Sequence, residues 1–437
     1  MSGQAYKMDG FDENVSPAFL KDDVRKLESK NRTLTFCTAF AVFLAFVGFV
    51  LAAFAARFVD QNGSALERAH LGDGSVVLRL GQSSLSGYSS AYSLFRGSGS
   101  WTNKPPLATR TSDFQAVTVG DKIYLIGGQD DSGNALNTLV EYDVIRETYT
   151  TKTSMPGTRL RFAAVAHDGK IYVIGGLSAD DCSDMLHTTL VYNVSADSWT
   201  TGPSLEIGRS DTCAAVVDGK IYVVGGYDVI ANDWSSGDAA LSSVEMLDTS
   251  ATTPRWTSAP ALPEKRGDVT CASSGGSVYA FGGYYEPNWN GTLGFKDTVF
   301  ALDVSSGASA WVTKSPMPGA RGDKAAATLS DGSIVVVGGE TFADQYTTQI
   351  AMHTVEQYYP KHDTWVAKAP IPTARFRFAA AAHNDFVHAF GGHEICTTTY
   401  DASGNFVGSD CATTANTLDS HEVLMDVTHP DVWVHVK

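Results

Sequence analysis

Six short apolar runs along the chain end in a pair of glycines, and they recur every 48 to 57 residues. They read KIYLIGG, KIYVIGG, KIYVVGG, SVYAFGG, SIVVVGG and FVHAFGG, and their first glycines are Gly127, Gly175, Gly225, Gly282, Gly338 and Gly391. β-Branched and aromatic residues in runs of this length favour strands. Self-similarity at a nearly fixed period indicates a repeat architecture, in which each unit covers the apolar face of its neighbour.

Each unit also carries an arginine sixteen or seventeen residues before its double glycine and an aromatic residue after it. The arginines are Arg110, Arg159, Arg209, Arg266, Arg321 and Arg375. The aromatic residues are Tyr149, Trp199, Trp256, Trp311, Trp365 and Trp433. Each unit therefore predicts four short strands: one after the arginine, one into the glycines, one such as LVEYD, and one around the aromatic residue. We expect sheets of this kind to be arranged radially.

This pattern resembles the kelch repeat, whose hallmark is a double glycine followed by spaced Tyr and Trp, and the resemblance covers residues 101–437. It implies an all-β, six-bladed kelch-like β-propeller. Tyr149 departs from the pattern by replacing the first Trp, and the sixth unit has a long insertion between Gly392 and Ser420. The closure of the ring stays open, because either Trp101 or Trp433 can supply the outer strand of the closing blade.

A different pattern precedes the repeats, since residues 34–56 contain no charged side chain. A helix of this length crosses a hydrocarbon core of ~30 Å, so we expect one transmembrane helix, a signal anchor, at 34–57. The basic residues of its flank lie before the span: Lys21, Arg25, Lys26, Lys30 and Arg32. This asymmetry predicts a cytosolic tail at 1–33. The alternative is a signal peptide that is cleaved near Ala55.

The chain beyond the span then faces the exterior or a lumen, at the plasma membrane or a secretory-pathway membrane. Residues 58–100 are rich in Ser and Gly and predict a flexible stalk. Gly48, Ala52 and Ala56 repeat every four residues in the span, which lets two helices approach closely and predicts a homodimer through the span. With 48 acidic and 32 basic residues, the net charge of -16 argues against nucleic acid as a partner.

The loops between the second and third strands of each unit should share one face with the connections between blades. They carry aromatic residues, which are common in binding sites on rigid scaffolds: Trp234, Tyr284, Tyr285, Trp289 and Tyr346. The alternative is that these rings pack the loops down. In related kelch adaptors the corresponding arginines line the partner-binding face, so the resemblance implies this role for the six arginines above. The alternative there is that each arginine caps backbone carbonyls of its blade.

Charged residues recur fourteen positions before each double glycine, three of them acidic and three basic: Asp113, Arg161, Asp211, Asp268, Lys324 and Arg377. We expect a ring of paired charges at the mouth of the central channel. The connecting loops hold 14 acidic residues against one basic residue, Lys296, which predicts attraction for a cationic partner or divalent ions. The alternative is that these acids only solvate the face.

We expect no cofactor, with calcium as the alternative, because three of the loop acids, Asp180, Asp181 and Asp184, offer oxygen ligands for it. Glu340 and Asp344 are spaced like two of the three iron ligands of plant kelch specifier proteins, but Thr348 stands at the third position. Two carboxylates alone hold iron weakly, so we expect Glu340 and Asp344 to be solvated loop acids.

Five cysteines follow the span, and Cys396 and Cys411 share the insertion of the sixth unit, where we expect a disulfide. Cys213 and Cys271 fall in the first strands of adjacent units, where burial as free thiols is the alternative to pairing. Cys182 is a further candidate partner for either of them.

No glycine-rich phosphate loop with Lys and no Gly-x-Ser-x-Gly occurs in the sequence. We therefore expect a binding module rather than an enzyme: a type II single-pass membrane glycoprotein that displays a propeller to a protein or glycan. The alternatives are a carbohydrate-active or metal-dependent enzyme built on the propeller, and a structural subunit of a membrane complex.

The topology predicts which Asn-x-Ser/Thr sites carry glycans. Secretory routing should modify one or more of Asn62, Asn193 and Asn290, which follow the span, whereas Asn14 and Asn31 should stay bare in the cytosol. Glycosidase treatment followed by gel mobility measures this outcome. Modification at Asn14 or Asn31 would mean that the topology is inverted.

Overall fold

The computed structural model describes residues 66–70, 76–80, 99–178, 185–228, 239–285, 294–342, 349–394, 398–400, 406–409, 417–425 and 432–436. The chain divides into two compact units, Ser90–His429 and Met1–Ser89 with Pro430–Lys437. No helix within the described residues is long and apolar enough to cross a membrane. The span predicted at 34–57 and the tail at 1–33 lie outside these residues.

The smaller unit contains a three-stranded antiparallel sheet in the order β1-β2-β33. Its strands are β1 (Leu66–His70), β2 (Val76–Leu80) and β33 (Val432–Val436). The run SVVLRL, which contains β2, thus pairs on both sides, with Leu80 opposite Leu66 and Val432. Trp433 lies in β33 and so belongs to this sheet.

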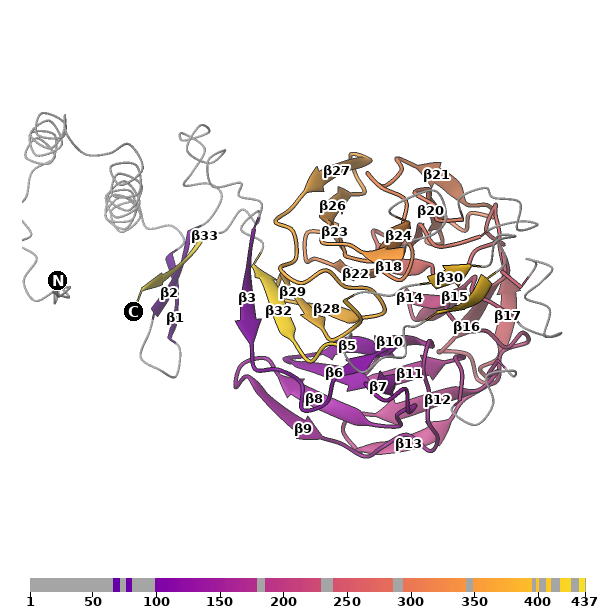
Figure 1. The fold of residues 1–437 in the computed structure, drawn as a ribbon, viewed down its shortest axis with the longest axis horizontal. Coiled ribbons are helices and arrows are strands. Elements are labelled where there is room, and N and C mark those ends of the chain that lie inside the picture. Colours follow the sequence, from indigo (N-terminus) through magenta and orange to yellow (C-terminus); the bar gives the residue numbers. More distant parts are fainter. Residues whose placement is uncertain are drawn as a thin grey trace, which may run out of the picture. The chain divides into compact units, whose positions relative to one another are not determined.

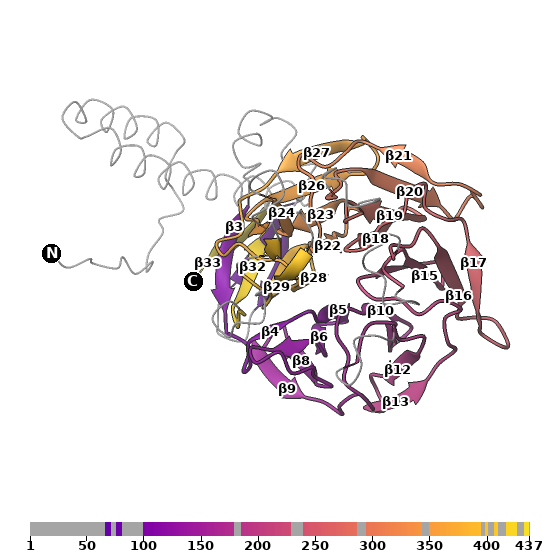
Figure 2. The same ribbon diagram turned by 45° about the vertical axis from the view of Figure 1, so that its right-hand side comes forward.

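The larger unit consists of six four-stranded antiparallel sheets arranged around a centre (Figures 1 and 2). Blade one contains β5 (Gln115–Val119), β6 (Lys122–Ile126), β8 (Leu139–Asp143) and β9 (Thr148–Thr151). Blade two contains β10 (Ala163–His167), β11 (Lys170–Ile174), β12 (Thr189–Asn193) and β13 (Ser198–Thr201). Blade three contains β14 (Cys213–Val217), β15 (Lys220–Val224), β16 (Val244–Asp248) and β17 (Trp256–Ala259).

The remaining three blades repeat this meander from the centre outward. Blade four contains β18 (Thr270–Ser274), β19 (Ser277–Phe281), β20 (Val299–Asp303) and β21 (Val312–Lys314). Blade five contains β22 (Ala325–Thr328), β23 (Ile334–Val337), β26 (Val355–Tyr359) and β27 (Thr364–Ala367). Blade six contains β28 (Ala379–His383), β29 (Phe386–Phe390), β32 (His421–Met425) and β3 (Ser100–Lys104).

Three two-stranded ribbons accompany the blades, formed by segments outside the four-stranded sheets. They pair β4 (Thr111–Ser112) with β7 (Gln129–Asp130), β24 (Glu340–Phe342) with β25 (Gln349–Ala351), and β30 (Thr398–Tyr400) with β31 (Phe406–Ser409).

The ring closes through β3, which pairs with β32 as the outer strand of blade six, so Trp101 rather than Trp433 completes the last blade. Every outer strand then uses its aromatic residue in the same way. Each indole N–H donates to a carbonyl of the preceding blade, for example Trp199 to Thr153 and Trp101 to Ala369, both at 2.8 Å. Tyr149 replaces tryptophan in blade one, and its hydroxyl donates to Pro105 at 2.8 Å.

Apolar side chains fill each of the six junctions between neighbouring blades. The cluster between blades one and two, for example, joins Ile126 and Leu139 to Ile171 and Val173, all fully buried. Because every blade contributes one face to each of two junctions, its second strand is buried on both sides, which explains why this strand reads as an uninterrupted apolar run.

The double glycines link each blade to the next. Gly127 and Gly128 have φ of 56° and 90°, and a Cβ on them would lie 2.5 Å from the Arg159 carbonyl oxygen and 2.3 Å from that of Ser112. Glycine adopts this left-handed conformation without a steric penalty. The Gly128 N–H donates to the Arg159 carbonyl of blade two at 2.8 Å. The same bond recurs at every junction and ends where Gly392 donates to Thr111 of blade one.

Where blades six and one meet, buried polar rings form a hydrogen-bonded chain. The Tyr149 hydroxyl lies 3.0 Å from Nδ1 of His421, and Nε2 of His421 lies 2.9 Å from Nδ1 of His388. Because Tyr149 donates to Pro105, it accepts from His421, whose Nε2 then accepts from His388. The His421 imidazole, with one nitrogen donating and the other accepting, is therefore neutral, and burial keeps the His388 imidazole neutral as well.

These two histidines predict a loss of stability in mild acid. Burial lowers the pKa of His388 to about 3 and that of His421 to about 2. Below about pH 6.5, where an exposed imidazole titrates, only the unfolded chain takes up these protons until the folded pKa values are reached. The unfolding free energy should then fall by up to about 1.4 kcal/mol per pH unit for each histidine.

The variant His421→Val should flatten this dependence between about pH 7.5 and 5.5, and urea unfolding at a series of pH values measures it. Valine occupies the equivalent strand position in three other blades, as Val244, Val299 and Val355. The exposed His362→Gln serves as the control and should keep the wild-type slope. An unchanged slope in His421→Val would contradict the neutral pair.

Candidate functional site

Five of the six repeated arginines are buried inside their blades: Arg159, Arg209, Arg266, Arg321 and Arg375. In four of them a terminal guanidinium nitrogen donates to the first glycine carbonyl of its own blade, as Arg209 does to Gly225 at 3.0 Å. This matches the alternative in which the arginines cap backbone carbonyls. Since their side chains are 0% to 4% exposed, they hold the blade end together and do not present charge to a partner.

Three of these arginines form ion pairs with a buried glutamate of the third strand. Arg209 lies 2.6 Å from Glu245 and Arg375 lies 2.7 Å from Glu422, while Arg321 pairs with Glu356. In blade two the equivalent position is Leu190, so Arg159 has no such carboxylate, and burial lowers its pKa to about 10. In blade four Arg266 stacks 4.7 Å above the ring of Phe300.

Arg110 does not follow this pattern, because its side chain is exposed. It lies seventeen residues before the double glycine of blade one, one more than Arg159 does in blade two. In the other blades the backbone carbonyl of the arginine accepts the N–H of the preceding blade's second glycine. In blade one the carbonyl of Thr111 accepts this bond, from Gly392. The grouping of Arg110 with the buried arginines is therefore corrected: among the six, Arg110 alone is exposed.

Six charged residues surround the mouth of the central channel, one at the start of the first strand of each blade. We call them the charged ring: Asp113, Arg161, Asp211, Asp268, Asp323 and Arg377. All six have a left-handed backbone, with φ between 46° and 56°. Five ring N–H groups donate to the carbonyl of the ring residue in the preceding blade, as Arg161 does to Asp113 at 3.0 Å. Backbone hydrogen bonds between blades thus fix the Cα positions from which these side chains extend.

The structure brings together five of the six ring residues predicted from sequence and replaces Lys324 by Asp323. The spacing fails in blade five, whose Asp323 stands fifteen residues before Gly338, because the hairpin between its first two strands holds one more residue than that of blade four. Lys324 is 5% exposed, and its ammonium has no hydrogen-bond partner within the described residues. The ring therefore holds four acids and two bases.

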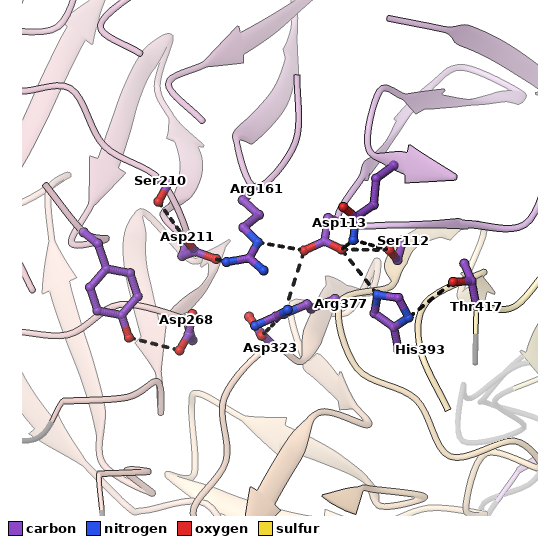
Figure 3. Close-up of polar contacts among 12 residues, drawn as sticks. Ser112, Asp113, Arg161, Ser210, Asp211, Asp268, Asp323, Arg377, His393 and Thr417 are labelled. Carbon is purple, nitrogen blue, oxygen red and sulfur yellow. Dashed lines mark hydrogen bonds and ion pairs between the residues drawn. The ribbon is translucent and has the colours of Figure 1, made fainter. Parts of the chain in front are cut away.

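The two ring arginines both lie beside Asp113, and they link it to Asp211 and Asp323 (Figure 3). Nε of Arg161 donates to Asp113 at 2.9 Å, and a terminal nitrogen of Arg161 lies 3.8 Å from Asp211. Nε of Arg377 donates to Asp323 at 2.7 Å and lies 3.8 Å from Asp113. Burial alone would raise the pKa of Asp113, but Arg161, His393 and Arg377 together hold it well below its usual range.

In blades one, three and six the residue directly after the double glycine contacts a ring acid, and the sequence analysis gave none of these three residues a role. Gln129 donates to Asp113 at 2.9 Å, and Nε2 of His393 lies 3.5 Å from the same carboxylate. The Tyr227 hydroxyl donates to Asp268 at 3.0 Å. The available signal was position alone: each of these residues follows the glycines at the channel end of its strand. Glu340 holds the same position in blade five and is 2% exposed, so the expectation of a solvated acid there was wrong.

The opposite side of the ring from Asp113 carries three consecutive acids, Asp211, Asp268 and Asp323, which we call the acidic arc. One carboxylate oxygen from each lies within 4.8 Å of those of the other two. Burial and the neighbouring carboxylates Asp323 and Asp211 raise the pKa of Asp268 well above its usual range. Burial likewise raises the pKa of Asp211, against the opposing effect of Arg161.

A cavity of about 230 Å³ opens between the ring residues and continues along the first strands. Its wall consists largely of small side chains such as Ala116, Ala164 and Ala380. Cys213 and Cys271 also line it and form a disulfide, which joins the first strands of blades three and four two or three residues after Asp211 and Asp268. This pairing resolves the open question about Cys213 and Cys271.

The described loop aromatics partly pack against one another. Tyr284 lies edge-on to Phe295 with ring centroids 5.1 Å apart, and Phe295 lies 5.0 Å from Phe342, while Tyr285 is half-buried. Asn193 ends β12, where its Oδ1 accepts from the Ala196 N–H. Several predicted residues lie outside the described residues: Trp234, Trp289, Tyr346, Asp180, Asp181, Asp184, Cys182, Cys396, Cys411, Asn62 and Asn290.

Comparisons with known proteins agree with this fold. The sequence profile of the family described as "KLHDC2/KLHL20/DRC7 Kelch-repeats domain" matches residues 92–259 and 190–392. Kelch-like protein terF of Aspergillus terreus is 32% identical over 63% of this chain and 60% of its own length. Alpha-scruin of Limulus polyphemus is 35% identical over 19% of this chain and 9% of its own length. Kelch domain-containing protein 8B of Bos taurus is 30% identical over 36% of this chain. This chain covers less than two thirds of the length of these relatives.

The buried arginines predict a large difference between Arg209 and Arg110. Arg209→Ala leaves Glu245 buried without its partner and should lower the unfolding free energy by about 3 to 5 kcal/mol. Arg110→Ala removes an exposed side chain and should change it by no more than about 0.5 kcal/mol. The pair Arg209→Met with Glu245→Leu, which copies the leucine of blade two, should cost less than Arg209→Ala alone. Urea unfolding measures all three, and equal losses for Arg209→Ala and Arg110→Ala would overturn this division of roles.

Proposed function

Because the chain belongs to the kelch-repeat family of β-propellers, we propose that its propeller binds a partner protein through the face that carries the charged ring. We call this the mouth face; it is the face at which the second strands end in their double glycines. The connections between second and third strands leave from it in every blade, at Gly128, Gly176, Gly226, Gly283, Gly339 and Gly392. Binding residues are commonly held on such connections above a rigid scaffold.

One observation carries the proposal: six non-glycine residues at equivalent positions keep a left-handed backbone around an open, charged cavity. Strained backbone of this kind persists where the surrounding structure imposes it, and it concentrates at functional sites. The charge of the ring also supports recognition of an oppositely charged side chain. Arg161 and Arg377 are 28% and 17% exposed and so can meet a partner carboxylate, while the acidic arc can meet a cationic group.

The proposed setting is the outer or lumenal side of a membrane, with the span 34–57 as a signal anchor and its helix as the contact of a homodimer. This part of the proposal is supported by the uncharged run and the basic residues before it. A glycan is the other ligand class that the sequence predicts, and the experiment below separates it from a protein partner.

Proximity labelling on intact cells tests the mouth face with two matched double variants of the full chain. Arg110→Glu with Tyr285→Ala changes one exposed cation and one half-buried aromatic residue on the mouth face. Arg146→Glu with Ile145→Ala changes a cation and an apolar residue on the opposite face, in the turn between β8 and β9. We expect labelling of specific partners to fall severalfold in the first variant only.

Enzymatic deglycosylation of the labelled partners distinguishes the ligand classes, because a protein-binding face keeps its partners after glycans are removed. Labelling that depends on the opposite-face pair, or is unchanged by the mouth-face pair, contradicts the proposed site.

A further inference from the structure

The acidic arc has the dimensions of a cation site. Calcium binds oxygen ligands at about 2.3 to 2.6 Å, so two oxygens on one ion lie no more than about 5 Å apart. The oxygens from Asp211, Asp268 and Asp323 all lie within 4.8 Å of one another. Each comes from a different blade, and backbone bonds between blades hold the three positions in place.

The arc is only partly neutralised by the charges around it. Arg377 pairs with Asp323 at 2.7 Å, but Arg161 approaches Asp211 only to 3.8 Å, and Asp268 receives a neutral hydroxyl from Tyr227. Both arginines are shared with Asp113 on the far side of the ring. The neighbouring Lys324 offers little compensation, because burial and Arg321 lower its pKa well below its usual range. Carboxyl groups this close together cannot all be ionised unless a cation binds between them, and otherwise at least one of them keeps its proton.

A second, independent observation points to a ligand here. Glu340 is 2% exposed, and its Oε2 has no hydrogen-bond partner among the described residues. Its carboxyl lies within hydrogen-bonding reach of Asp323, since β24 begins beside Gly322, the residue before Asp323. A buried carboxylate oxygen left unpaired is costly and calls for a partner. A fourth, buried acid thus lies beside Asp323 with one carboxylate oxygen unpaired among the described residues.

We propose that Asp211, Asp268 and Asp323 bind a divalent cation beside the buried carboxyl of Glu340, calcium in preference to magnesium. Three carboxyl groups that converge from three blades, with a fourth next to Asp323, suit the flexible, oxygen-rich coordination of calcium. Magnesium demands an almost regular octahedron and keeps several waters. This site is separate from the loop acids Asp180, Asp181 and Asp184, and it does not depend on the identity of any partner.

Calcium titration of the purified full chain, first stripped with a chelator, tests the site by calorimetry and by thermal unfolding. We expect saturable binding of one high-affinity ion, an increase in the unfolding midpoint with calcium concentration, and a much weaker effect of magnesium.

The matched variants are Asp268→Asn and Asp218→Asn. Both residues have a left-handed backbone, at φ of 48° and 50°, and asparagine tolerates this conformation. Asp218 lies in the hairpin between β14 and β15, at the end of blade three's first strand that is farther from the charged ring. Asp268→Asn should weaken calcium binding at least about tenfold, as loss of a direct ligand exceeds the usual cost of an outer-shell change. Asp218→Asn should bind as the wild type does.

Terbium luminescence provides a readout that does not depend on folding stability. The Tyr227 hydroxyl lies 3.0 Å from Asp268, so its phenol should sensitise a terbium ion bound at the arc. Tyr227→Phe should reduce the emission while leaving calcium competition intact. The proposal is overturned if the stripped chain shows no calcium-dependent heat or midpoint shift, or if Asp268→Asn and Asp218→Asn bind calcium equally well.

Discussion

The bond between the second glycine of each blade and the carbonyl of the next blade is the interaction on which the rest of this propeller depends. Only a residue without Cβ fits at Gly128, because a Cβ there would lie 2.3 Å from the Ser112 carbonyl oxygen, and the Gly128 N–H donates to the Arg159 carbonyl. Repeated at six junctions, this contact sets the distance between neighbouring first strands. The apolar clusters between blades and the indole bonds at the rim add stability to a spacing that the backbone already imposes.

The same junction explains why a strongly charged side chain recurs in the interior. The buried arginines satisfy glycine carbonyls that the abrupt end of the second strand leaves without a ladder partner. Three blades compensate the buried charge with a glutamate of the third strand. Blade four stacks Arg266 on Phe300 and pairs it with Glu264, and in blade two Arg159 donates to backbone carbonyls and to the Thr188 hydroxyl. Blade one, where the ring closes, has no buried arginine at this position. There the Thr111 carbonyl accepts the N–H of Gly392.

Because the backbone of this ring is fixed by bonds between blades, it can hold like-charged side chains close together despite their mutual repulsion. Arg161 and Arg377 stabilise Asp113 strongly, while the acidic arc on the other side is left with excess negative charge. The propeller therefore concentrates both a cationic and an anionic surface around one cavity. The proposed partner would meet the arginines of this ring and the proposed cation its acidic arc, so the two proposals rest on opposite sides of the same uneven charge distribution.

The repeat spacing determined the family, the number of blades and the arginine and ring positions in most blades, because these follow from residues that are close in sequence. Counting along the chain failed where a loop differed by one residue: it chose Lys324 instead of Asp323 and grouped Arg110 with the buried arginines. Only the tertiary structure decided that Trp101 closes the ring, that Cys213 pairs with Cys271, and that Glu340 is buried beside Asp323. The first two are contacts between strands far apart in the chain, and the third depends on how β24 folds back beside Gly322 within blade five, none of which local sequence patterns encode.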